Sequence, residues 1–397
     1  MTTMRPCEIC SNIDLEPIHR QHFLFPGQAD PVHYDVVACQ NCGFAFASDI
    51  PDQPSLNRFY QDSEHHLHQE LPAGLARIHD DFFEAVRKNV TLSPATRVLD
   101  IGSGMGHFLS RFKKAGLHNL TGIEPSPQAA RLGREVYDLE IRTETLDSFT
   151  PAAPFDLVTL CGVLEHIADL RASLHRINAL LKSNGHLFIA VPDAASFGKQ
   201  PPAEAFLEFA LEHINFFGAT SLNNLLRQTG FEEVQVESHH NDFYDNHYLL
   251  ALYRKRSGSV VNEIIHKDNH VTASLKSYIT LSRKCLLPVA GITTELADCG
   301  EPLLIWGAGS LTSRLLCDTR LGQANIVGVI DRNQALHGRK ILGIPITGPE
   351  ILDRWAGTTV LVASTTYAEE IRGKLLEAYN WKGKIIIFDQ PDCKGQP

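Results

Sequence analysis

A strand that leads directly into a glycine-rich turn places the tightest constraint on the fold of this chain. Residues 98–106, VLDIGSGMG, combine an apolar run ending near Asp100 with Gly102, Gly104 and Gly106, and the helical sequence HFLSRFKKAG follows. Glycine lets a backbone approach a ligand closely, because it carries no Cβ atom. The pattern predicts a nucleotide-binding turn between a strand and a helix, although a lone glycine-rich turn is also compatible with a simple chain reversal.

Short apolar runs alternate with helical periodicity from about residue 75. The runs RVLDIG, NLTGIEP, FDLVTLCG and GHLFIAVPD read as strands, and the segments between them read as helices. Strands that alternate with helices in this way build a parallel sheet covered by helices. We therefore predict an α/β fold with a doubly wound domain over residues 71–255.

An acidic residue follows the second predicted strand. Glu124 comes about 20 residues after the glycine-rich turn, where a carboxylate can accept hydrogen bonds from both hydroxyls of a ribose. We expect a nucleotide-like cofactor to contact Asp100, the three glycines and Glu124. Asp147, in TETLDSF after the third strand, either approaches the adenine of that cofactor or caps a helix.

Four of the nine cysteines form two pairs near the N-terminus. Cys7 and Cys10 bracket one short turn, Cys39 and Cys42 bracket another, and 28 residues separate the pairs. Two such knuckles can hold one tetrahedral metal ion, and four thiolates leave no open position for a substrate. We expect a structural Zn²⁺ ion in a zinc-binding domain over residues 1–70, with further structure in the long spacer. Disulfides are the alternative, which a reducing cytoplasm disfavours.

A second strand–turn–helix unit opens the last part of the chain. LLIWGAGSLTSRLL places Gly307 and Gly309 between a strand and a helix, and Asp331 follows the strand IVGVI about 20 residues later. With TVLVAS and KIIIF as further strands, the pattern predicts a Rossmann-like domain over residues 256–397, in which Thr312 replaces the third glycine of a dinucleotide site. A bound NAD is one interpretation. We favour a platform without a redox cofactor, because no dehydrogenase constellation accompanies the turn.

These motifs together resemble a known enzyme family. The alternate glycines after Asp100 resemble the first motif of class I S-adenosylmethionine-dependent methyltransferases, and FDLVTLCGVLEH resembles their fourth strand and the turn after it. The order of the CxxC knuckles, VLEHIADL, LEHINFF and GAGSLTSRLL resembles the deoxysugar C-methyltransferases along nearly the whole chain. The resemblance implies S-adenosylmethionine as cofactor and methylation of a carbon beside the keto group of a nucleotide-linked sugar.

The resemblance also implies the catalytic residues. The Glu-His pair of the family falls on Glu212 and His213, its histidine after the fourth strand falls on His166, and its tyrosine after the zinc module falls on Tyr60. A histidine base would remove the proton beside the carbonyl, and the adjacent carboxylate would orient that base. A tyrosine hydroxyl or a second imidazole would stabilise the enolate.

Structural alternatives exist for the same side chains. His166 is also suited to line its turn, and Glu212 and His213 precede two phenylalanines that are suited to anchor a core segment. The histidines at 65, 66 and 68 read more readily as a solvated face than as a metal site, because the knuckles already supply a complete ligand set. Two other functions stay open: O- or N-methylation of another small metabolite, since Ala210 replaces a tyrosine of the family, and non-catalytic binding of the cofactor.

Charge and hydropathy limit the partners. A formal net charge of −10 leaves no excess of cations to neutralise phosphates, which disfavours nucleic acid and anionic membranes. The N-terminus lacks the apolar core of a secretory signal, and no stretch approaches the roughly 20 apolar residues that span a bilayer. We expect a cytoplasmic protein with a small-molecule substrate, in line with a nucleotide sugar.

Overall fold

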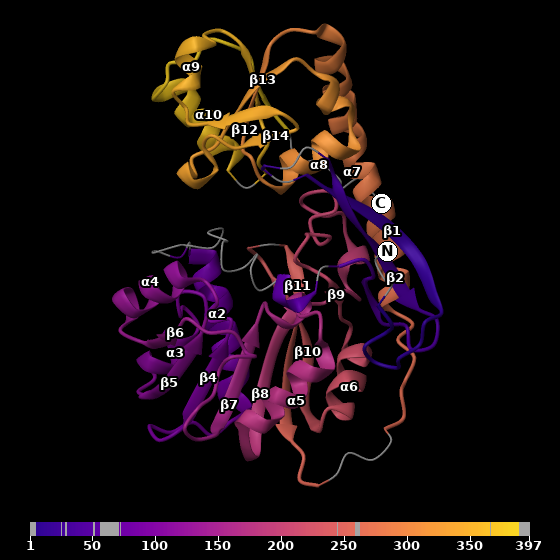
Figure 1. Ribbon diagram of the computed structural model, residues 1–397, viewed down its shortest axis with the longest axis vertical. Helices are drawn as coiled ribbons and strands as arrows, with labels where there is room; N and C mark the ends of the chain where they lie inside the picture. Colours follow the sequence, from indigo (N-terminus) through magenta and orange to yellow (C-terminus); the bar gives the residue numbers. More distant parts are fainter. Residues whose placement is uncertain are drawn as a thin grey trace. The chain divides into compact units, whose positions relative to one another are not determined.

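Figure 1 shows the computed structural model of the protein, which describes residues 5–24, 26–27, 30–50, 52–55, 71, 73–243, 245–258, 263–365 and 367–388. The chain divides into two compact units of three segments each. Unit 1 comprises Met1–Ile18, Val36–Phe197 and Glu212–Leu275, and unit 2 comprises His19–Asp35, Gly198–Leu211 and Lys276–Pro397. The domain boundaries after residues 70 and 255 stay predictions, and residue 70 lies outside the described residues.

The large sheet of unit 1 contains seven strands. Their spatial order is β10 (Phe231–Asn241), β11 (Asn246–Lys255), β8 (Leu181–Pro192), β7 (Phe155–Cys161), β4 (Arg97–Ile101), β5 (Asn119–Ile123) and β6 (Glu140–Arg142). The strands from β8 to β6 are parallel neighbours. By contrast, β11 runs antiparallel to β8 and to β10. The four predicted strands are β4, β5, β7 and β8, and the carboxyl ends of these parallel strands meet at one edge of the sheet.

Helices cover both faces of this sheet (Figure 1). One face carries α2 (Ala73–Asn89), α3 (Leu109–Lys114) and α4 (Pro127–Tyr137), and the other carries α5 (Leu170–Leu180) and α6 (Ala219–Gln228). Val98 and Leu99 on β4 point to opposite faces, because side chains alternate along a strand. Val98 lies in one core with Phe82 and Phe112, and Leu99 lies in the other with Leu174. The predicted doubly wound α/β fold is confirmed.

A smaller sheet joins the N-terminal segment to a segment far along the chain. It consists of β1 (Leu15–Phe23), β2 (Val32–Cys39), β3 (Ala45–Ala47) and β9 (Asn215–Phe216), in that order. The spacer between the cysteine pairs therefore forms strands, as expected. Antiparallel pairing places Ala45 opposite Phe216 and Phe46 opposite Asn215. The cysteines, Phe44 and Phe46 also share one continuous apolar core with α5, α6 and the large sheet.

Unit 2 contains the second predicted Rossmann-like sheet. Its strands are, in spatial order, β14 (Lys340–Ile341), β15 (Ile344–Thr347), β13 (Ile326–Ile330), β12 (Leu303–Trp306), β16 (Thr359–Val362) and β17 (Ile385–Ile387). All neighbours are parallel except the β14–β15 pair. The helices are α8 (Ser310–Asp318), α9 (Ile351–Arg354), α10 (Ala368–Glu377) and the part of α7 (Val271–Cys299) that starts at Lys276. Among the described residues, none of the helices combines the length and apolar character needed to traverse a bilayer.

Candidate active site and metal centre

The glycine-rich turn after β4 uses its three glycines for different reasons. Gly102, Gly104 and Gly106 have φ angles of 67°, 53° and 78°, a left-handed conformation that favours glycine. A Cβ atom on Gly106 would lie 2.8 Å from Leu139 Cδ1 and 2.9 Å from Ile141 Cδ1, whereas a Cβ atom on Gly104 would meet no atom within 4 Å. A side chain at 106 would thus displace the ends of Leu139 and Ile141, while the backbone at 104 faces open space that a ligand can approach.

Two buried carboxyl groups lie beside this turn. Asp100 is 3% exposed and its Oδ1 accepts the Thr159 hydroxyl at 2.6 Å. Burial, with a smaller contribution from Glu124, raises the pKa of Asp100 to about 7. Burial also raises the pKa of Glu124, against the opposing effect of two backbone amides.

Those amides fix the orientation of Glu124 at the end of β5. Its Oε2 accepts the Gly104 N–H at 2.8 Å, and its Oε1 accepts the Ser126 N–H at 2.8 Å. Ser126 in turn caps α4 by accepting the Ala129 N–H, which is the usual way to satisfy a free amide at a helix start. The structure therefore brings Asp100, Glu124 and the glycines together at one edge of the sheet.

Asp147 lies apart from these contacts. It is exposed in a turn over residues 146–148 that leads to β7, and no helix begins there. The helix-capping alternative for Asp147 is thus wrong, and its contact with an adenine stays a prediction.

Three side chains gather after β7, where residues Leu164–His166 form the 3₁₀ turn η1. Glu165 is 3% exposed, and its Oε1 lies 3.7 Å from His166 Nε2. The rings of His166 and His213 are 5.2 Å apart between centroids. One ligand atom from each of Glu165, His166 and His213 lies within 4.8 Å of the other two. Two histidines that are distant in sequence thus meet at the carboxyl edge of the large sheet.

Asn215 on β9 holds η1 in place. Its side-chain amide, which is 2% exposed, donates to the carbonyls of Leu164, Glu165 and Ile167 at 3.2, 3.3 and 2.7 Å. The Ile214 N–H donates to the Glu165 carbonyl at 3.0 Å. These bonds tie the segment that carries His213 to the turn that carries His166.

Arg5 braces the same segment from the N-terminal end. Its guanidinium donates to the carbonyls of Ala168 and Ile214, each at 3.1 Å, and to Asn215 Oδ1 at 2.6 Å. It also lies 4.8 Å from the ring centroid of Phe46. Burial lowers the pKa of Arg5 to about 10, so the group stays charged at neutral pH.

Sequence reasoning missed three residues of this arrangement: Glu165, Asn215 and Arg5. Glu165 stands in the VLEHIADL motif, but only the following histidine was taken from it. Glu212, expected to orient His213, is half-buried and is not among the three side chains that gather here. Tyr60 and the histidines at 65, 66 and 68 lie outside the described residues.

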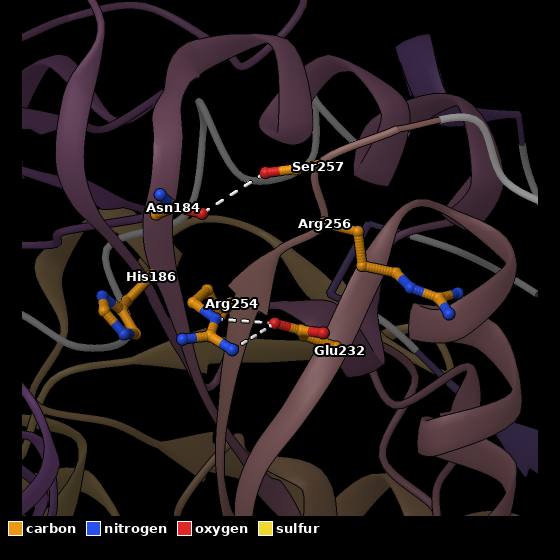
Figure 2. A pocket seen from close by; sticks show the side chains of 6 residues that line it. All are labelled: Asn184, His186, Glu232, Arg254, Arg256 and Ser257. Carbon is orange, nitrogen blue, oxygen red and sulfur yellow. Dashed lines mark hydrogen bonds and ion pairs between the residues drawn. The ribbon is translucent and has the colours of Figure 1, made fainter.

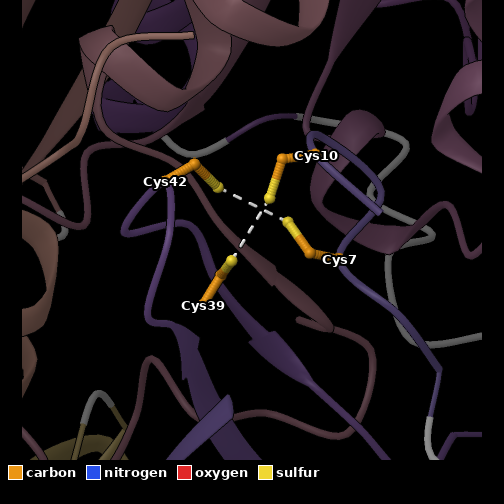
Figure 3. A group of neighbouring side chains, drawn as sticks. All are labelled: Cys7, Cys10, Cys39 and Cys42. Carbon is orange, nitrogen blue, oxygen red and sulfur yellow. Dashed lines mark hydrogen bonds between the residues drawn. The ribbon is translucent and has the colours of Figure 1, made fainter. Parts of the chain in front are cut away.

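The four N-terminal cysteines converge on one point, as Figure 3 shows. Cys7 Sγ lies 3.5 Å from Cys42 Sγ, and Cys10 Sγ lies 3.3 Å from Cys39 Sγ. All four are free thiols, and these separations exceed the bond length of about 2.05 Å in a disulfide. They are near the spacing of about 3.8 Å between sulfurs that surround one zinc ion at 2.3 Å. The four sulfur atoms therefore fit a metal ion with tetrahedral coordination.

Two side chains form hydrogen bonds with the backbone of the glycine turn in unit 2. The Ala308 N–H donates to Asp331 Oδ2 at 2.8 Å, and the buried Thr312 hydroxyl donates to the Gly307 carbonyl. Arg314 on α8 forms a buried ion pair with Glu204. Thr312, which takes the place of a third glycine, therefore bonds back to the turn. The interpretation of this unit as a platform without a redox cofactor stays a prediction.

A cavity of about 490 Å³ lies near the amino end of β8 (Figure 2). It is lined by Asn184, His186, Glu232, Arg254, Arg256 and Ser257. The charges in it are paired, since Arg254 contacts Glu232 and Arg256 contacts Glu263. None of the predicted site residues in the described part of the chain lines this cavity.

Two family models match the chain. One, a methyltransferase domain, matches residues 63–236, and another, described as C2185-like, N-terminal, matches residues 301–387. Ubiquinone biosynthesis O-methyltransferases from Rhodopseudomonas palustris (strain HaA2) and Bradyrhizobium sp. (strain ORS 278) are each 33% identical over 132 residues. These alignments cover 31% of this chain and 52% of each relative, so the chain spans about half the length of the curated relatives it matches.

Two solved structures are similar to the chain at lower sequence identity. A 1,6-didemethyltoxoflavin-N1-methyltransferase from Burkholderia thailandensis is 21% identical, with a TM-score of 0.40, and the match covers 55% of this chain and 98% of that one. The N-methyltransferase NodS from Bradyrhizobium japonicum WM9 is 18% identical, with a TM-score of 0.39, over 51% of this chain and 98% of that one.

Proposed function

We propose that this chain, whose central domain is a class I S-adenosylmethionine-dependent methyltransferase domain, transfers a methyl group from that cofactor to a small molecule. The observation that carries the proposal is the meeting of two sets of groups at one edge of the large sheet. The glycine-rich turn with Glu124 follows β4 and β5, and His213, just before β9, meets His166 in the turn after β7. In open α/β sheets, ligands bind outside the carboxyl ends of the strands.

The glycine-rich turn and Glu124 are proposed to hold the cofactor. The open space beside Gly104 lets the cofactor approach the backbone of the turn. Glu124, already oriented by two amides, keeps lone pairs that can accept hydrogen bonds from ribose hydroxyls. When bound, S-adenosylmethionine supplies an electrophilic methyl group on a sulfonium centre. Asp100 contributes a buried carboxyl that fixes the strand end through Thr159.

The acceptor is proposed to be a carbon beside the keto group of a nucleotide-linked deoxysugar. His213 takes the proton from that carbon, and the nearby imidazole of His166 donates a hydrogen bond to the enolate oxygen. The carbon then forms a bond to the methyl group as the sulfonium S–C bond breaks, and S-adenosylhomocysteine leaves. The support is the half-buried histidine pair, since two imidazoles within 5.2 Å can serve one acceptor.

O-methylation is the second candidate, and the names of the curated relatives favour it. The same imidazole would then take a proton from a hydroxyl group, and the resulting oxygen anion would attack the methyl group. This reaction involves no exchange of a proton on carbon.

A methyl-transfer assay tests the proposal. The protein is incubated with S-adenosylmethionine and a panel of nucleotide keto sugars and hydroxylated metabolites, and products are analysed by mass spectrometry. We expect a gain of one methyl group on a keto sugar, with α-proton exchange in deuterated water. Methylation of a hydroxyl group without α-proton exchange would show that the acceptor atom is an oxygen and not a carbon. If calorimetry detects no binding of S-adenosylmethionine, the proposed function is wrong.

A His213→Ala variant tests the role of the histidine. Loss of the imidazole should abolish exchange and methylation and leave the affinity for S-adenosylmethionine unchanged, because the cofactor contacts are assigned to other residues. If this variant keeps near-normal turnover, His213 is not the base, and His166 becomes the candidate for that role.

The cysteine cluster is proposed to hold one structural Zn²⁺ ion. Cys7, Cys10, Cys39 and Cys42 supply a complete tetrahedral set, which leaves no position for a substrate.

A further inference from the structure

We propose that Glu165, His166 and His213 together bind one divalent metal ion at the carboxyl end of β7. One ligand atom from each residue lies within 4.8 Å of the others, and Glu165 Oε1 lies 3.7 Å from His166 Nε2. This group shares no residue with the cysteine cluster, which has its own complete ligand set. The chain would therefore hold two different metal ions.

The distances are close to those that an ion requires. Nitrogen and oxygen ligands bind at about 2.1 Å, so neighbouring ligand atoms around one ion lie about 3.0–3.4 Å apart. The present separations of up to 4.8 Å need inward movements of about an ångström, which rotation of half-buried imidazoles can supply. The site needs no change in the backbone.

The backbone around the site is already fixed. Asn215 bonds three carbonyls of η1 and its flanks, including that of Glu165, and the Ile214 N–H bonds the same Glu165 carbonyl. The two ligands on η1 and the ligand at 213 are thus held in one rigid frame. Ligands preorganised in this way bind an ion without an ordering cost.

The donor set defines the class of ion. Two imidazoles and one carboxylate suit first-row divalent ions such as Mn²⁺, Fe²⁺, Co²⁺ and Zn²⁺, whereas Mg²⁺ prefers oxygen ligands. Three protein ligands leave open positions, in contrast to the closed cysteine cluster. Glu165 is 3% exposed, so its carboxyl group lies away from bulk water.

The open coordination positions of the ion suggest a role in the reaction. This role rests on the proposed function. An ion bound there would hold a keto or hydroxyl oxygen of the acceptor and lower the pKa of its proton. The imidazoles would then act as ligands, and the proton would pass to solvent water. This role of the ion would replace the free-base role given to His213 and the hydrogen-bond role given to His166, and it keeps the cofactor site and the methyl transfer of the proposed function.

Titration with Mn²⁺ tests the site, with free Mn²⁺ followed by electron paramagnetic resonance. The full chain is first loaded with zinc and stripped of loosely held metal, because Mn²⁺ does not compete well for thiolates. We expect saturation at one Mn²⁺ per chain and unchanged zinc content. Glu165→Gln and His213→Ala should each weaken Mn²⁺ binding at least about tenfold, since each removes a ligand.

Glu212→Gln is the matched control, because it removes a carboxylate next to His213 that is not in the cluster. Its Mn²⁺ affinity should equal that of the unmodified chain, with circular dichroism confirming that all variants fold. Absence of saturable Mn²⁺ binding, or an equal loss in Glu212→Gln, would overturn the proposal.

Activity separates the site from the proposed function. Saturable Mn²⁺ binding in a chain that methylates none of the panel compounds supports the site and counts against the function. Full methylation by protein that retains one zinc but no second ion supports the function and overturns the role of the ion.

Discussion

At the scale of single residues, Gly104 and Gly106 share a backbone conformation but differ in their surroundings. Gly106→Ala should lower the free energy of unfolding by about 2–4 kcal/mol, because left-handed strain adds to a clash with Leu139 and Ile141. Gly104→Ala should cost only about 1–2 kcal/mol, which is the strain alone. Urea unfolding of both variants measures the difference. Equal losses would contradict the packing role of Gly106.

The buried Asp100 carboxyl should make stability depend on pH. Its pKa is raised from 3.8 to about 7, so the folded state binds more protons than the unfolded state between these values. The free energy of unfolding therefore falls as pH rises from about 4 to about 7, by at most about 1.4 kcal/mol per pH unit from this group.

Asp100→Asn checks this dependence, because an amide keeps an oxygen for the Thr159 hydroxyl and removes the titration. Urea unfolding at about pH 5, 6 and 7 should give a flatter profile for the variant than for the unmodified chain. Parallel profiles would show that Asp100 is ionised in the folded state throughout this range.

At the scale of elements, the sequence was sufficient to predict the strands and the turn that depend on local sequence pattern. The strands β4, β5, β7 and β8 and the turn at Gly102–Gly106 follow from apolar runs and glycine spacing. The brace links Arg5 to Asn215, 210 positions apart, and Asn215 to Ile167, 48 positions apart, and periodicity carries no information about such pairs. The sequence pattern did not identify Glu165, because its position is fixed by contacts with Ile214 and Asn215, which lie far along the chain.

The brace yields a prediction about η1. Asn215→Ala leaves the carbonyls of Leu164, Glu165 and Ile167 without their side-chain donor and should lower the free energy of unfolding by about 2–4 kcal/mol. Asn119→Ala, at an exposed asparagine whose side chain donates to the Pro94 carbonyl, should change it by less than about 0.5 kcal/mol. Comparable losses in thermal or urea unfolding would show that the brace adds little.

At the scale of the whole molecule, the sequence predicted both Rossmann-like sheets but not the segments that complete each unit. Unit 2 includes His19–Asp35 and Gly198–Leu211. Within it, the Tyr34 hydroxyl donates to the Ala210 carbonyl, and the Phe206 N–H donates to Ser282 Oγ. These contacts link segments with no shared pattern, so a linear division into domains did not anticipate them.

Loss of the proposed zinc should affect more than the N-terminal segment, because the cysteines share a core with α5, α6 and the large sheet. We expect one zinc per chain by metal analysis, and Cys39→Ser should lower both zinc content and the unfolding temperature of unit 1. Cys317→Ser, at a half-buried cysteine outside the cluster, is the control and should retain the zinc. If the chain folds normally without bound zinc, the proposed structural role of the ion is wrong.

The pairing of β3 with β9 has a consequence for how the protein is made. Residues 45–47 leave the ribosome early, but their partner strand begins only at residue 215. At translation rates of about 5–20 residues per second, roughly 8–35 s pass before β9 emerges. During that interval β3 can pair with β2, but its other edge lacks β9, and an early-bound zinc would hold the two nascent knuckles together. His213 emerges just before β9, so the histidine pair forms only when this late strand docks.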